Sequence, residues 1–263
     1  MRCLKKVFSF FLSMMLIFGA AGNPCSAFDG PTHVYVTQRG LEIFADVLRL
    51  IFYKEEGVFF TDEDIEIILI FCVKPDEDEI GGAYKYHFYN PVTGLNFMGE
   101  NDSALTRCVD HFNRALYYIS ELEDQDDVER ARIYREKAME ELGRALHFLG
   151  DLNTPVHTNN QTLLDTGFNF FFHVSFENTC KSVQDRVRAS MQPGELRYYE
   201  VNSVETIANC SAHLADDNLY ALYEKLLTKE QVAENSVKNA QKAIAGLLYK
   251  FYLMANKYNA IHV

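Results

Sequence analysis

The sequence predicts an all-α protein built as a single multi-helix bundle domain. Apolar side chains recur at helical spacing along most of the chain, and Gly and Pro gather in a few segments between these stretches. The 263 residues, 48% of them hydrophobic, are enough for one domain with a real core. We find no internal repeat, low-complexity segment or convincing linker, so the prediction is one domain.

The first 27 residues have the pattern of a secretory signal peptide. Basic side chains at Arg2, Lys5 and Lys6 precede an apolar run over 7–17 that is too short for a confident membrane span. Small side chains before Phe28 predict cleavage after Ala27. We therefore expect a soluble, secreted protein whose catalytic domain covers 28–263.

The first half of the mature chain is expected to hold three helices. Residues 32–53 carry apolar side chains at helical spacing, and residues 62–71 begin with acidic residues that suit a helix start. Residues 73–101 contain six Gly or Pro and are predicted to be loop. A helix over 103–121 follows, with apolar side chains again at helical spacing.

The second half is expected to hold four more helices. An acidic turn over 121–127 precedes a long helix over 128–151, whose inward face would hold Ala131, Ala138, Leu142, Ala145 and Leu149. After a loop over 152–170, helices are predicted over 171–191, 202–226 and 230–257. The last of these shows a clear apolar stripe from Val237 to Met254.

The pattern H-x3-D-x5-H over 147–157 is the strongest functional signal. His147 and Asp151 are four apart and so lie on one helix face, and Pro155 should end that helix before His157. His173 and Glu177 repeat the four-residue spacing. Imidazole and carboxylate groups are the ligands that zinc prefers among divalent cations.

A single such pair on a helix is usually an ordinary surface or capping pair, but two pairs with further histidines indicate more than one metal. His33, His87 and His157 join the pattern. The remaining histidines have no partner at ligand spacing and are expected to be structural or exposed: His111, His213 and His262.

Charge and cysteine content narrow the class of protein. Cleavage after Ala27 removes three basic residues and no acidic one, so the net charge changes from −12 to −15. This is a poor basis for nonspecific nucleic-acid binding, although bound cations could still attract phosphate. The mature chain keeps four cysteines, either as disulfides Cys72–Cys108 and Cys180–Cys210 or as four buried thiols.

Four segments, 28–33, 87–94, 147–157 and 173–178, carry a specific resemblance. The segment at 87–94 reads HFYxPxTG, and the segment at 147–157 reads HxLGDxNxPxH. Over roughly 28–255 the chain resembles the bacterial zinc-dependent phospholipases C, the phosphatidylcholine-hydrolysing enzymes related to clostridial alpha-toxin. That family shares its fold and a trinuclear zinc site with the single-strand-specific zinc nucleases.

The resemblance implies three zinc ions per chain, bound in one cleft of the bundle. The first would be held by His87, His147, Asp151 and an upstream aspartate, for which Asp78 is preferred and Asp76 is the alternative. The second would be held by His157, His173 and Glu177. The third would be held by His33, by Asp151 as a bridge, and by the backbone amino group and carbonyl oxygen of Phe28, where the family has Trp.

Cations in such a cleft lower the pKa of bound water and offset charge that builds up at phosphorus. Asp78 is the candidate for both ligand and proton acceptor. For the headgroup, Tyr84 occupies the aromatic position three residues before His87, while Glu79 stands where the family has a second aromatic residue. Both are predicted to bind substrate, and the headgroup choice stays open.

Three functions remain open at the level of sequence. A secreted phospholipase C is favoured by the H-x3-E pair and by the HFYxPxTG segment. A single-strand-specific zinc nuclease or another phosphoesterase is the alternative, because the five residues from Phe28 to His33 are a nuclease-like spacing. A metal-stabilised binding protein is the third.

The expected partner is phospholipid at a membrane surface or in micelles. The protein is expected to be a monomer with no stable nucleic-acid partner. The chain leaves no room for the extra C-terminal β domain of the larger toxins.

Overall fold

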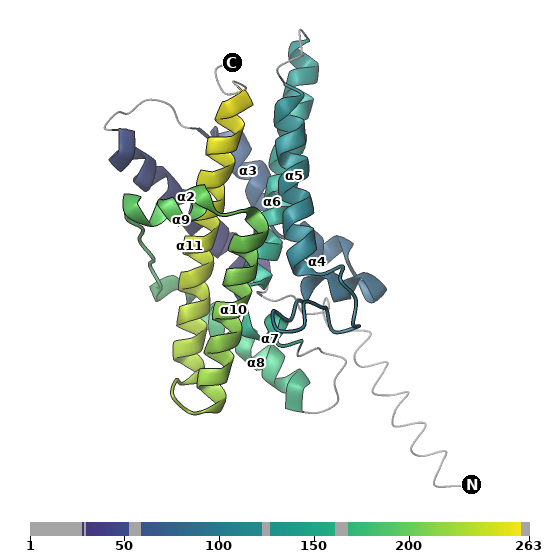
Figure 1. The fold of residues 1–263 in the computed structure, drawn as a ribbon, viewed down its shortest axis with the longest axis vertical. Coiled ribbons are helices and arrows are strands. Elements are labelled where there is room, and N and C mark those ends of the chain that lie inside the picture. Colours follow the sequence, from purple (N-terminus) through teal and green to yellow (C-terminus); the bar gives the residue numbers. More distant parts are fainter. Residues whose placement is uncertain (1–27, 29, 53–58, 123–126, 161–167, 259–263) are drawn as a thin grey trace, which may run out of the picture.

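The computed structural model describes residue 28 and residues 30–52, 59–122, 127–160 and 168–258. The predicted signal peptide over 1–27, and His262, lie outside these residues. Within them the backbone forms helices and a single isolated bridge, between Asn90 and Leu95, which confirms the all-α prediction (Figure 1). No helix in the described part of the chain is long and apolar enough to cross a membrane.

The long helices form the bundle, and short helices lie between them. The long ones are α2 (Gly30–Phe52), α3 (Asp62–Phe71), α5 (Ala104–Ser120), α6 (Val128–Asp151), α8 (Phe168–Val183), α10 (Val204–Tyr223) and α11 (Lys229–Ala255). The short ones are α4 (Lys74–Asp78), η1 (Gly81–His87), α7 (Pro155–Thr158), η2 (Gln184–Arg186), η3 (Pro193–Glu195), α9 (Leu196–Val201) and η4 (Asn256–Tyr258).

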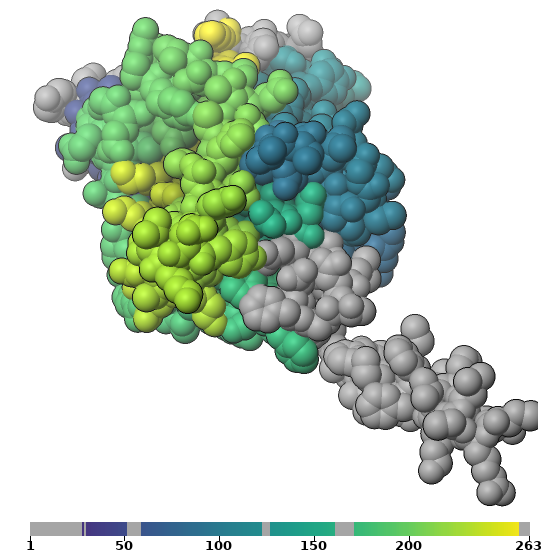
Figure 2. All heavy atoms as spheres, turned by 60° about the horizontal axis from the view of Figure 1, so that its bottom comes forward, coloured from purple at the N-terminus to yellow at the C-terminus, as the bar shows by residue number. Residues whose placement is uncertain are grey.

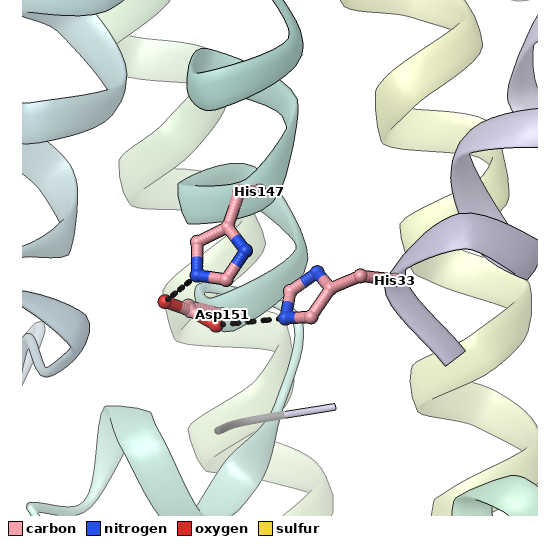
Figure 3. Close-up of side chains that lie close together, drawn as sticks. All are labelled: His33, His147 and Asp151. Atoms are coloured by element: carbon pink, nitrogen blue, oxygen red, sulfur yellow. Dashed lines mark ion pairs between the residues drawn. The ribbon is translucent and has the colours of Figure 1, made fainter. Parts of the chain in front are cut away.

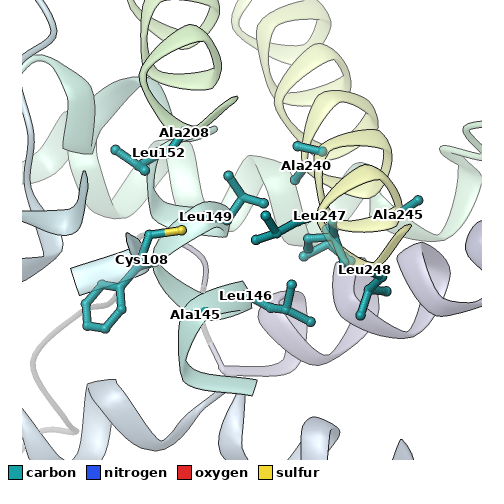
Figure 4. Close-up of a cluster of buried hydrophobic side chains, with 14 of the residues drawn as sticks. Cys108, Ala145, Leu146, Leu149, Leu152, Ala208, Ala240, Ala245, Leu247 and Leu248 are labelled. Atoms are coloured by element: carbon teal, nitrogen blue, oxygen red, sulfur yellow. The ribbon is translucent and has the colours of Figure 1, made fainter. Parts of the chain in front are cut away.

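Helix α6 is the centre of the bundle. It packs against α5, α3 and α11, and Figure 1 shows α5 and α6 side by side. Figure 4 shows Leu146 and Leu149 of α6 facing Leu247 and Leu248 of α11, and all four side chains are fully buried. Burial of each leucine contributes about 1.5–3 kcal/mol. This core fixes the C-terminal end of α6, which carries His147 and Asp151.

The start of α3 is tied to α6 by a buried carboxylate. Asp64 closes a capping box with Thr61, whose backbone N–H donates to Asp64 Oδ2 at 2.8 Å. Arg135 of α6 donates to both oxygens of the same carboxylate, at 2.9 and 2.7 Å. One side chain therefore sets where α3 begins and how it lies on α6.

The segment 81–103 closes over the lower end of the bundle. The backbone N–H of Tyr89 donates to the carbonyl of His157 at 3.2 Å, and the Tyr89 hydroxyl donates to Asn209 of α10 at 2.7 Å. Figure 2 brings this end forward and shows the blue segment beside the green of α10, with a small teal surface between them. The segment holds His87 against the end of α6.

Two parts of the secondary structure differ from the sequence prediction. The predicted loops contain α4, η1 and α7, which have seven residues or fewer and are too short to give a periodic pattern. Helix α8 ends at Val183, although the prediction extended to 191. Gln241 of α11 explains this difference, because its buried amide accepts from the N–H of Ala189 at 2.9 Å and donates to the carbonyl of Val187 at 3.2 Å. This amide gives an extended backbone the partners that a helix would have supplied.

The predicted disulfides are wrong in this structure, and the alternative of free thiols is correct. None of Cys72, Cys108, Cys180 and Cys210 forms a disulfide, and the first three are buried. The Cys72 thiol donates to the carbonyl of Leu69 at 3.1 Å, and burial raises the pKa of both Cys72 and Cys108 to about 12. These cysteines behave as small apolar side chains of the core.

Candidate metal centre

Buried histidines and carboxylates meet where α6 ends. Three groups of side chains each place their ligand atoms within 4.8 Å of one another: His33, His147 and Asp151; Asp76, His87 and His147; and His157, His173 and Glu177. His147 belongs to two of these groups. The structure therefore brings together every side chain predicted to bind metal except Asp78.

The chain reaches this centre through a sharp change of direction after α6. Helix α6 ends at Asp151, and Pro155 begins the single turn α7, where its missing N–H costs nothing. His157 therefore lies on a helical turn, and its side chain is 1% exposed. Sequence spacing placed His157 just beyond the helix, and α7 supplies the element that aims it inward.

The group of Asp76, His87 and His147 lies beside the carboxylate of Asp151. Asp76 Oδ1 lies 3.4 Å from His147 Nε2 and 3.6 Å from His87 Nδ1. Asp151 Oδ2 lies 2.9 Å from the same His87 nitrogen and 3.4 Å from His147 Nε2. Two carboxylates and two imidazoles thus point at one small volume, which is a donor set that suits zinc.

The preference for Asp78 over Asp76 is corrected by this geometry. Asp78 lies at the end of α4, where its carboxylate pairs with Arg144 and its side chain is half exposed. Asp76 lies two residues earlier on the opposite side of this single turn and is 16% exposed. The sequence could not separate them, because α4 is too short for a periodic pattern and four acidic residues follow one another.

The group of His33, His147 and Asp151 adjoins the group of Asp76, because it shares His147 with it. His33 of α2 reaches across to α6, and its Nε2 lies 3.4 Å from Asp151 Oδ1 (Figure 3). Its ring stacks on His147 with centroids 4.0 Å apart. Because Asp151 directs one oxygen to His33 and the other to His87 and His147, this carboxylate is placed to bridge two cations.

Phe28 lies beside His33. Its side chain is fully buried, and its ring meets the His33 ring edge to face with centroids 5.6 Å apart. Gly150 packs against the same imidazole, since a Cβ there would lie 2.9 Å from His33 Nδ1. The predicted mature N-terminal residue is therefore next to the histidine with which it was predicted to share a cation.

The third group joins α7 to α8. His173 Nε2 lies 2.9 Å from Glu177 Oε1, one helical turn apart, and the ring centroids of His157 and His173 are 5.0 Å apart. The side chains of His173 and Glu177 are 0% and 5% exposed. The predicted H-x3-E pair is therefore buried beside His157.

Backbone carbonyl groups orient two of the imidazoles. His147 donates from Nδ1 to the carbonyl of Cys72 at 2.9 Å, and His157 donates from Nδ1 to the carbonyl of His87 at 2.7 Å. With Nδ1 occupied, the Nε2 atom of each ring faces the centre. Such outer hydrogen bonds fix the tautomer and the ring position of metal-binding histidines.

Burial and neighbouring charges shift the pKa values of four side chains in the centre. Burial lowers the pKa of His33 and lowers that of His157 well below its usual range, so both rings stay neutral. Burial alone would raise the pKa of Asp151, but the neighbouring imidazoles of His147, His33 and His87 hold it well below its usual range. Burial opposes charge on His147, yet Asp151 and Asp76 raise its pKa to about 9.

The residues present fit bound cations. His157 Nε2, Asp76 Oδ2 and Asp151 Oδ1 are buried with no hydrogen-bond partner. Each such atom costs about 1–3 kcal/mol unless something binds it. Cations at these three groups would satisfy the atoms and would replace the proton on His147.

The two predicted substrate residues lie at the edge of the centre. Tyr84 of η1 is buried, with its ring centroid 5.9 Å from that of His87. Glu79, which follows α4, is mostly buried and lies 3.9 Å from Arg107. Sequence reasoning missed Arg107 and Glu141, and it expected His111 to be structural or exposed. His111 is buried and paired with Glu141, while His213 is exposed.

Comparison with known proteins finds similar sequences and similar folds. No protein-family model matches the chain. The chain is 24% identical to a phospholipase C of Paraclostridium bifermentans over 277 aligned positions, which cover 95% of this chain and 67% of the relative. It is 27% identical to the enzyme of Clostridium novyi, with 70% and 48% covered, and 22% identical to that of Clostridium perfringens, with 89% and 63% covered.

The solved structures agree on the fold. The alpha-toxin of Clostridium absonum superposes with a TM-score of 0.65 at 23% identity, covering 86% of this chain and 63% of the toxin. The alpha-toxin of an avian strain of Clostridium perfringens gives 0.66 at 20% identity, covering 84% and 62%. The chain is a relative of the bacterial phospholipases C. It spans about half to two thirds of the length of these curated relatives.

Proposed function

We propose that this protein is a secreted, zinc-dependent phospholipase C that hydrolyses glycerophospholipids to diacylglycerol and a phosphorylated headgroup. The observation that carries the proposal is the set of three ligand groups at the end of α6, two of which share His147. The similarity of the chain to bacterial phospholipases C supports the same reading. Phosphatidylcholine is the substrate that the family resemblance suggests first.

We propose three zinc ions, one for each group of residues. Zinc bound here would supply a Lewis acid for the phosphate and a water of lowered pKa. The chain itself would orient the substrate phosphate and exclude water, because the imidazoles that surround the centre are buried. We assign to Asp76 the role that the sequence analysis expected of Asp78. Asp76 Oδ1 lies 3.4 Å from His147 Nε2, and Asp76 Oδ2 is buried with no hydrogen-bond partner and could accept a proton.

The N-terminus of the mature chain is the last part of the proposal. With cleavage after Ala27, the backbone amine of Phe28 would be free beside His33 and could bind the third zinc. Protein that retains residues before Phe28 should therefore hold less zinc. The proposed enzyme acts as a secreted monomer on phospholipid at a membrane surface or in micelles and forms no stable nucleic-acid complex.

The test is release of phosphocholine from a short-chain phosphatidylcholine by protein that begins at Phe28. Release that stops with a chelator and returns with added zinc supports the proposal. Single-stranded DNA is assayed in parallel, and its rapid cleavage without phospholipid turnover would assign the protein to the nucleases. Zinc-loaded protein that hydrolyses neither phosphodiester would indicate a binding protein.

A further inference from the structure

A polar subsite adjoins the group of Asp76, His87 and His147. It consists of Glu79, which follows α4, and of Arg107 and His111, which lie one turn apart on the same face of α5. Arg107 Nη1 lies 3.9 Å from Glu79 Oε1. The ring of His111 stacks on Phe148, which follows His147 in α6. None of these three side chains belongs to the metal-binding groups.

Two acceptor atoms in this subsite have no hydrogen-bond partner. Glu79 Oε2 is buried and unpaired. His111 donates from Nδ1 to Glu141 at 2.6 Å, so that in this tautomer its buried, unpaired Nε2 carries a lone pair. A buried carboxylate oxygen and a buried imidazole nitrogen that both lack a donor are unfavourable unless a ligand supplies one.

Arg107 does not satisfy Glu79. Its Nε lies 3.3 Å from Asp102 Oδ1, and its guanidinium lies over the ring of Tyr86, 3.9 Å from the centroid. These contacts hold the guanidinium at salt-bridge distance from Glu79 without a hydrogen bond. Burial raises the pKa of the Glu79 carboxyl, while the charges of Arg107 and of the nearby histidines His87, His111 and His147 act to lower it.

The ring of Tyr84, at the edge of the metal centre, is already packed against other aromatic rings. A quaternary ammonium has no N–H and is held by open aromatic faces. The ring of Tyr84 is packed against Phe88 at 5.1 Å, His87 at 5.9 Å and Phe97 at 6.4 Å between centroids. A primary ammonium has three N–H donors, which match bare acceptors rather than aromatic faces.

We infer that Glu79 and His111 form a headgroup subsite that selects a primary ammonium, as in an ethanolamine headgroup, over a trimethylated one. The inference rests on the proposed phospholipase function and deepens it. The phosphate would lie at the metal centre while the ammonium donates to Glu79 Oε2 and to His111 Nε2. Each methyl group added to the nitrogen removes one donor and adds bulk beside a buried carboxylate.

The experiment is a methylation series on the zinc-loaded mature protein. Short-chain phospholipids with identical acyl chains and ethanolamine, monomethyl, dimethyl and trimethyl headgroups are assayed below their micelle concentrations, and kcat/KM is measured for each. The expected result is a stepwise fall of about tenfold from ethanolamine to choline, which corresponds to roughly 1.4 kcal/mol. Equal or faster turnover of the choline lipid would overturn the inference.

Variants of Glu79 and His111 test whether this subsite causes the preference for the ethanolamine headgroup. Glu79→Gln keeps the shape but removes the charge, and the ethanolamine-to-choline ratio should fall to within about threefold of one. His111→Phe keeps an aromatic ring against Phe148 but removes the acceptor and should lower the ratio in the same direction. Glu77→Gln is the matched control, because Glu77 is half exposed and pairs with Lys74. A ratio that Glu79→Gln leaves unchanged, with normal folding and zinc content, would refute the role of Glu79.

A binding measurement separates this inference from the proposed function. If no phospholipid is hydrolysed, the proposed function fails, and calorimetry with phosphoethanolamine and phosphocholine on the zinc-loaded protein decides the subsite by itself. Binding of phosphoethanolamine at least tenfold tighter would support the subsite. Equal binding of the two would overturn it.

Discussion

Replacing Gly150 with alanine should lower activity strongly while leaving the fold intact. Gly150 lies on α6 between His147 and Asp151, and a Cβ there would lie 2.9 Å from His33 Nδ1 and 3.0 Å from Cε1. Ordinary contact begins near 3.4 Å, so the imidazole must move by about 0.5 Å. His33 cannot swing far, because its ring lies between the rings of His147 and Phe28.

The size of the effect follows from these contacts. Overpacking a core costs about 1–3 kcal/mol, and alanine recovers about 0.8–1 kcal/mol of helix propensity, so the net loss of stability should be about 0–2 kcal/mol. Activity should suffer more. A catalytic group misplaced by about 1 Å costs around a hundredfold, so a shift of about half that distance should lower kcat/KM by about 10- to 100-fold. The proposed third zinc should be lost or weakened.

The assay combines zinc stoichiometry, turnover of short-chain phospholipid and thermal unfolding. Gly143→Ala is the matched control on the same helix, since its Cβ would meet the carbonyl oxygen of Ile68 at 2.7 Å, away from the centre. That variant should lose stability but keep its zinc content per folded molecule. If Gly150→Ala keeps both wild-type turnover and wild-type zinc content, His33 does not take part in the centre as proposed.

Further predictions address the ligands and the core. Asp76→Asn should weaken zinc binding by at least about 10- to 100-fold in chelator competition. Asp78→Asn should change zinc binding little, because Asp78 pairs with Arg144 at the surface. The reverse result would make Asp78 the metal ligand. Chelation should lower the melting temperature by roughly 8–16 °C, since ligand at a thousand times its Kd contributes about 4 kcal/mol to a domain of this size; an unchanged melting curve would argue against buried cations. Arg135→Met should destabilise the protein by about 2–4 kcal/mol in urea unfolding without changing zinc content, because it leaves the Asp64 carboxylate buried and uncompensated. A thiol reagent at neutral pH should modify only Cys210 in the folded mature protein and all four cysteines after unfolding, because burial raises the pKa of Cys72 and Cys108 to about 12 and encloses Cys180; rapid modification of several native thiols would show that the core opens.

Much of the site was predictable because its strongest signals are local. A four-residue spacing on a helix puts two side chains on one face whatever surrounds them, so His147 with Asp151 and His173 with Glu177 could be paired before any fold was known. The long helices were predictable for the same reason. Their ends agree with the prediction within a few residues except at α8, where the partner of the backbone is the side chain of Gln241, more than fifty residues away.

Only the tertiary structure decided the choices that depend on contacts between distant segments. Asp76 and Asp78 are equivalent in sequence, and their roles differ because one side of α4 faces His87 and His147 while the other faces Arg144. The bridging position of Asp151 required α2 to place His33 on its far oxygen. His111 had no partner at helical spacing, because its partner Glu141 is thirty residues away on the neighbouring helix. The sequence by itself determined which side chains could bind metal, since ligand chemistry and helical spacing are local properties. Which of them share one centre, and which acceptors beside it lack a donor, was decided by the packing of α2, α5 and α6 around the buried end of one helix.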